Sequence, residues 1–72
     1  MAEQDLVALI GAVAGEIWTY LDENGPTSMG KLMKIVDEPR DVVMQAIGWL
    51  AREDKLEIAL DGRTRLVSLR SQ

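Results

Sequence analysis

The chain has no cysteine and no histidine among its 72 residues. Without cysteine it has no disulfides and no thiolate metal sites, and without histidine it lacks the commonest metal ligand and the usual base at neutral pH. It also lacks a glycine-rich phosphate loop at a strand-to-helix turn. Packing or a partner chain must therefore stabilise so short a protein, and we expect no metal and no cofactor.

The net charge and the length of the apolar run argue against further classes of protein. Eight lysines and arginines oppose 12 acidic residues, and the formal charge of −4 argues against wholesale electrostatic capture by nucleic acid or an anionic membrane. The apolar run at residues 6–13 follows acidic rather than basic residues and is too short to cross a bilayer. We expect one domain over residues 1–72, a cytoplasmic location and no membrane partner.

Three helices are predicted in the first three quarters of the chain. Apolar residues recur every three to four positions over residues 5–21, and the Asn-Gly-Pro at 24–26 ends that helix. The hydroxyl of Thr27 or Ser28 then caps a short second helix, and a third starts at Pro39 and runs to about residue 53. The third helix is expected to bury one stripe: Val42, Val43, Ala46, Ile47 and Leu50.

After the third helix, apolar residues recur at every second position. This pattern predicts a β-hairpin with its turn at residues 61–62. We favour a three-residue loop with a left-handed glycine over a strict two-residue loop. That register pairs Leu56 with Leu66 and Glu57 with Arg65, and so keeps one face apolar. The predicted fold is mainly α with a β-hairpin: a winged helix-turn-helix, with three helices followed by a two-stranded wing.

Two segments, AIGWLAREDKL at 46–56 and AGEIW at 14–18, resemble a family of small bacterial and archaeal winged helix-turn-helix proteins of uncharacterised function. The resemblance covers nearly the whole chain. It implies a compact winged-helix fold that often self-associates, and it supplies no catalytic or cofactor residues.

A DNA-binding function would use the outward face of the third helix and the wing. Gln45 suits adenine and Arg40 suits guanine or phosphate, whereas Asp41 would repel the phosphate backbone. The charged residues from 62 to 72 are all arginines and make the wing locally basic. The candidate nucleic-acid-binding residues are Arg40, Gln45, Arg52, Arg63, Arg65, Lys31 and Lys34.

A protein-interaction function is indicated by the first helix, whose apolar arc spans about half of its circumference where one core contact needs about 100°. Gly11 and Gly15 lie beside Trp18 and would admit another backbone, either a helix of the same domain or a partner. Trp18 and Trp49 stand at the edges of their core stripes, as core residues with a bonded N–H or as interface anchors. We expect a homodimer, with candidate interface residues Val7, Gly11, Gly15, Trp18 and Met44.

An enzyme is not indicated. Asp37, Glu38 and Asp41 lack the spacing of a calcium loop and are interpreted as helix-capping acids, and no serine or threonine has an evident base. Two functions stay open. One is a transcription-regulator-like module that binds double-stranded DNA weakly and with strong salt dependence. The other is a non-catalytic module that binds another protein and does not bind DNA.

Overall fold

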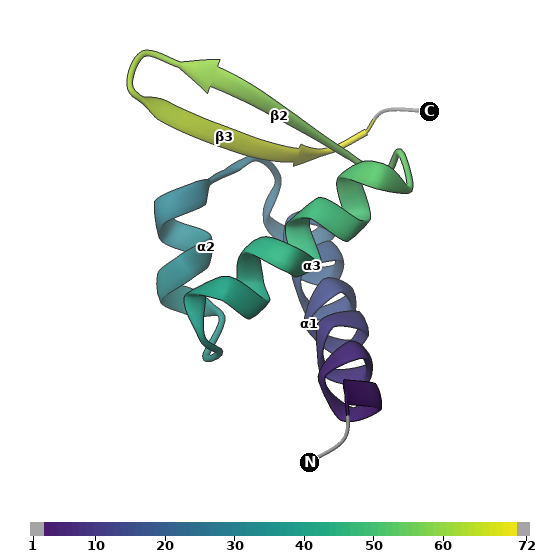
Figure 1. Ribbon diagram of the computed structural model, residues 1–72. Coiled ribbons are helices and arrows are strands. Elements are labelled where there is room, and N and C mark those ends of the chain that lie inside the picture. Colours follow the sequence, from purple (N-terminus) through teal and green to yellow (C-terminus); the bar gives the residue numbers. More distant parts are fainter. Residues whose placement is uncertain (1–2, 71–72) are drawn as a thin grey trace.

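The computed structural model describes residues 3–70, and the ends of the expected domain, residues 1–2 and 71–72, lie outside the described residues. Within this range three helices and three strands follow one another along the chain (Figure 1). They are α1 (Glu3–Asn24), β1 (Thr27–Ser28), α2 (Met29–Ile35), α3 (Arg40–Arg52), β2 (Leu56–Asp61) and β3 (Thr64–Leu69).

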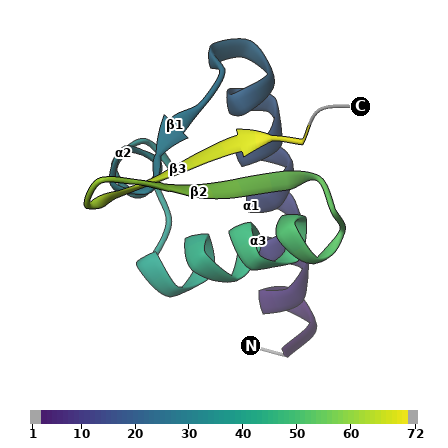
Figure 2. The same cartoon turned by 90° about the horizontal axis from the view of Figure 1, so that it is seen from above.

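The helices form one side of the molecule and the sheet the other. α3 crosses and packs against α1, and the β2–β3 hairpin lies over the helices with its turn reaching out above α2 (Figures 1 and 2). The core lies between them and draws its most buried side chains from every helix and from the middle of the sheet: Val13, Ile17, Leu32, Val43, Ala46 and Val67. The predicted core face of α3 is confirmed, since all five of its residues are buried.

The helix ends follow the local chemistry of the sequence. Gly25 adopts a left-handed φ of 80°, and its N–H donates to the Leu21 carbonyl at 2.8 Å, which closes α1 as expected. Of the two predicted caps for α2, Ser28 is correct, because its Oγ accepts from the Lys31 N–H at 3.1 Å. Thr27 is instead buried in β1, and its hydroxyl donates to the Gly25 carbonyl.

Replacing Gly25 with alanine should lower the free energy of unfolding by about 1 kcal/mol, because a Cβ disfavours the left-handed backbone that ends α1. Gly48→Ala is the matched control. Gly48 lies inside α3 with nothing within 4 Å of an added Cβ, so this change should raise stability by about 0.5–1 kcal/mol. Urea denaturation followed by circular dichroism measures both; equal effects of the two changes would contradict the αL assignment.

The predicted hairpin register is wrong by three residues. The turn has two central residues, Gly62 and Arg63, and only the first has positive φ, as in a type II′ turn. Leu56 consequently pairs with Leu69 rather than with Leu66, and Glu57 pairs with Ser68 rather than with Arg65.

A third strand causes this shift. β3 lies between β1 and β2, and Val67 pairs with Thr27 on one side and Ile58 on the other. Val67 is therefore fully buried at the centre of the sheet. Leu69 lies on the same side of the sheet, facing the helices, because residues two apart on a strand share a face. The chain thus forms two helices, α2 and α3, joined by a short turn and followed by a hairpin. This order confirms the predicted winged helix-turn-helix fold, to which β1 adds a strand.

Candidate nucleic-acid and partner surfaces

Three of the predicted nucleic-acid-binding arginines meet in one groove beneath the wing. Arg40 begins α3, Arg63 occupies the hairpin turn, and Arg65 follows on β3. Together with α2 they line a hollow of about 330 Å³, which we call the arginine groove: Ser28, Met29, Gly30, Met33, Arg40, Arg63, Thr64 and Arg65. Among the residues that the structure describes, none that lines this groove is acidic.

Each of these arginines is exposed, and none pairs with a carboxylate of residues 5–70. The ion pair of this part of the chain joins Arg70 to Asp54 at 3.0 Å, near the other end of the hairpin. The groove therefore presents guanidinium groups that are free to bind oxygen anions such as phosphate.

The outward face of α3 lies beside this groove and is exposed along its length. Gln45 and Arg52, the other predicted α3 contacts, stand on it, as does Asp41, whose charge opposes that of the arginines. Lys31 and Lys34 are exposed on α2 but do not line the groove. Gly48 lies in the middle of this α3 face, where the lack of a side chain leaves the helix backbone open to close approach.

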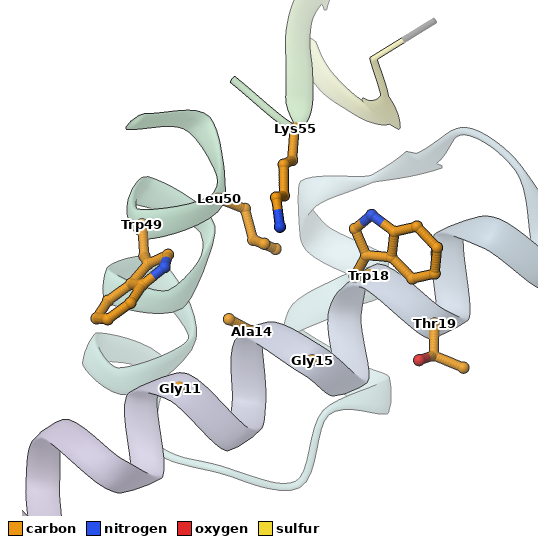
Figure 3. Close-up of a pocket in the computed structure, with 8 residues that line it drawn as sticks. All are labelled: Gly11, Ala14, Gly15, Trp18, Thr19, Trp49, Leu50 and Lys55. Carbon is orange, nitrogen blue, oxygen red and sulfur yellow. The ribbon is translucent and has the colours of Figure 1, made fainter. Parts of the chain in front are cut away.

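A second hollow lies between α1 and the C-terminal half of α3 (Figure 3). We call it the tryptophan groove because Trp18 and Trp49 stand at its two sides, 40% and 47% exposed. It measures about 340 Å³ and is lined by Gly11, Ala14, Gly15, Trp18, Thr19, Trp49, Leu50 and Lys55. Neither indole N–H donates a hydrogen bond to a described residue, which differs from the predicted core alternative.

The turn after α3 positions Lys55 in this groove. Asp54 has a left-handed φ of 65°, and the Lys55 N–H donates to the Leu50 carbonyl at 2.9 Å, the helix-ending pattern in which glycine is usual. Asp54 tolerates this conformation better than most residues, and the Arg70 guanidinium holds its carboxylate. The Lys55 side chain consequently extends over Leu50 between the two indoles (Figure 3).

The predicted interface residues divide between two places. Gly11, Gly15 and Trp18 line the tryptophan groove, and Val7 is 55% exposed one turn before Gly11 on α1. Met44 is also exposed, but it lies on the outward face of α3 and does not line this groove.

Sequence reasoning omitted several lining residues from both surfaces. Trp49 and Lys55 line the tryptophan groove but were not among the candidate interface residues, although Trp49 was considered as an interface anchor because it stands at the edge of the α3 core stripe. Ser28 and Thr64 of the arginine groove gave no signal, because only the packing of the wing over α2 brings them together.

A helix-turn-helix followed by a β-hairpin wing defines the winged helix-turn-helix class, whose members are typically non-catalytic. Within it, the chain belongs to the family described as winged helix-turn-helix domain (DUF2582), whose model matches residues 1–69. The resemblance noted in the sequence is thereby confirmed.

One relative is an uncharacterised protein, MJ1608, of the archaeon Methanocaldococcus jannaschii. The two are 36% identical over 70 residues, an alignment that covers 93% of this chain and 99% of the archaeal protein. No solved structure matches the chain significantly. In the described part of the chain, no helix is long and apolar enough to cross a membrane, and no three acidic side chains gather as a metal site would require.

Proposed function

We propose that this chain is a DNA-binding module that docks on duplex DNA through the arginine groove and the outward face of α3. The observation that carries the proposal is the convergence of Arg40, Arg63 and Arg65 on one groove in which no described residue is acidic. None of the three pairs with a carboxylate of residues 5–70. Phosphate contacts position such a module, and base-edge contacts specify its site.

The two parts of the surface have separate roles in this proposal. The arginines of the groove contact phosphates and set the angle at which α3 meets the duplex. Gln45 and Arg52 face base edges in the major groove, where an amide suits adenine and a guanidinium suits guanine. Gly48 allows the middle of α3 to approach the phosphate backbone closely.

Binding should be weak for one chain and depend steeply on salt. Each phosphate contact contributes about −0.9 to the slope of log affinity against log salt, so three arginines predict a slope of about −3 per chain. Lys31 and Lys34 would add to it. The net charge of −4 and the carboxylate of Asp41 oppose the approach and keep the affinity low.

A salt titration tests the function. Fluorescence anisotropy of a labelled mixed-sequence duplex of about 20 base pairs, measured from low to physiological salt, should show binding that weakens along this slope. The absence of binding at the lowest salt would reject the proposal, and so would an affinity independent of salt.

A second function is favoured by the tryptophan groove, because two half-exposed indoles beside a small-residue floor are typical of a protein-binding surface. In that case the fold acts as an interaction module without DNA binding. Both proposals are non-catalytic, need no cofactor and fit a cytoplasmic location.

A further inference from the structure

The floor of the tryptophan groove is open space bounded by small residues. An added Cβ at Gly11 or Gly15 would meet nothing within 4 Å. These glycines therefore do not serve a tight crossing with another helix of the domain, which was one of the two uses expected for them. Ala14 lies between them and is buried. The resulting hollow of about 340 Å³ has the size of a small-molecule site, for which about 300–1,000 Å³ is usual.

Two indoles form the walls above this floor. Trp18 stands on α1 and Trp49 on α3, and each is nearly half exposed (Figure 3). An aromatic ring placed between them would remove apolar surface from water on both sides and pack against other rings, an interaction that aromatic side chains favour. The walls therefore favour a flat, apolar occupant.

The ammonium group of Lys55 reaches into the groove. The Lys55 backbone is fixed on both sides, because its N–H donates to the Leu50 carbonyl and its carbonyl accepts from the Arg70 N–H, each at 2.9 Å. From there the side chain brings its Nζ between the two indoles (Figure 3). No carboxylate of residues 5–70 pairs with it. A positive charge beside apolar walls, where water is partly excluded, attracts an anionic group.

The neighbouring charges select the kind of anion. Trp18 and Lys55 also border a second hollow, whose other lining residues are Asp22, Asp54, Leu69 and Arg70. Arg70 binds Asp54 at 3.0 Å, which leaves Asp22 to oppose an anion in this part of the structure. A carboxylate carries one negative charge and matches Lys55, whereas a phosphate monoester carries up to two and a nucleic-acid backbone carries many. Asp22 and the net charge of −4 disfavour the more highly charged anions.

We propose that the tryptophan groove binds a small aromatic carboxylate, with its ring between Trp18 and Trp49 and its carboxylate on the Lys55 ammonium. The lysine stem is flexible, so Lys55 moves towards the rim as the ring enters and stays paired with the carboxylate there. The site depends on neither proposed function, because the arginine groove lies elsewhere and no partner chain is needed.

A titration of the folded chain with naphthoate tests this site. Two-dimensional proton–nitrogen NMR resolves the indole N–H of each of the two tryptophans, and both signals should shift together and saturate. A ligand of this size predicts a Kd of about 1 mM or lower. Naphthamide has the same ring without the charge and should bind about fivefold more weakly at low salt.

Three variants assign the contacts. Lys55→Met keeps a long apolar side chain and should abolish the preference for naphthoate over naphthamide. Lys34→Met removes the same charge from an exposed position on α2 that does not line the groove, and should keep the preference. Gly15→Leu fills the floor and should bind neither compound, while its spectrum stays that of a folded protein.

Three results would overturn the proposal. One is the absence of a saturable shift at ten times the expected Kd, and another is equal binding of the acid and the amide. The third is a preference for the acid that persists in Lys55→Met, which would place the anion elsewhere. Arg63→Glu with Arg65→Glu should bind naphthoate like wild type, and this separates a failure of the tryptophan groove from a failure of DNA binding.

Discussion

Replacing both Arg63 and Arg65 with glutamate is expected to lower the affinity for duplex DNA about 100-fold, or roughly 1.4 kcal/mol for each arginine. Both side chains are exposed, and neither pairs with a carboxylate of residues 5–70, so their removal leaves no buried group of this range without a partner. The salt slope should become shallower by about 2, because two phosphate contacts are lost. Anisotropy titrations at several salt concentrations measure both quantities.

A pair of single-residue variants controls for the effect of net charge alone. Arg63→Glu and Arg70→Glu change the net charge equally, but Arg70 lies at the far end of the wing and binds Asp54. Only Arg63→Glu should affect DNA binding strongly. Equal losses in the two variants would show that overall charge, rather than the arginine groove, governs the interaction. Far-ultraviolet circular dichroism should confirm that both variants are folded.

Local chemistry made the helices predictable. The Asn-Gly-Pro at 24–26, the Ser28 hydroxyl and the apolar stripe of α3 each act within a few residues, and the structure confirms all three. The hairpin register was not predictable in this way. β3 carries leucines on both of its faces, Leu66 and Leu69, and the pairing with β1, about 40 residues earlier in the chain, decides which face is buried.

Each candidate surface likewise combines residues that could be predicted with an arrangement that could not. Each arginine was recognisable from its place on the wing or at the start of α3, but the groove exists only because the hairpin turn lies over α2 (Figure 1). Likewise, the sequence placed each tryptophan at the edge of the core stripe of its own helix. The packing of α1 against α3 brings these edges together, and helical periodicity within one helix contains no information about that packing.

Ile17→Ala is expected to lower the free energy of unfolding by about 3 kcal/mol, because it opens a cavity at a fully buried position. Stabilities of about 0.05–0.15 kcal/mol per residue give a chain of this length only about 4–11 kcal/mol in total. The variant should therefore melt roughly 15 °C below wild type. Differential scanning calorimetry at low protein concentration measures this effect; a fall of only a few degrees would contradict the position of Ile17 in the core.

Trp18→Ala, one residue further along α1, provides the contrast. Trp18 faces the tryptophan groove, so its truncation should cost the single chain about 1 kcal/mol, through the part of the indole that packs on its own domain. Its main effect should be on the homodimer that the sequence predicts. A protein that dimerises when folded melts at a higher temperature as its concentration rises, and Trp18→Ala should remove most of this dependence, whereas Ile17→Ala should keep it. A concentration dependence that survives in Trp18→Ala would show that α1 carries no interface at this residue, and that the indole only covers the core.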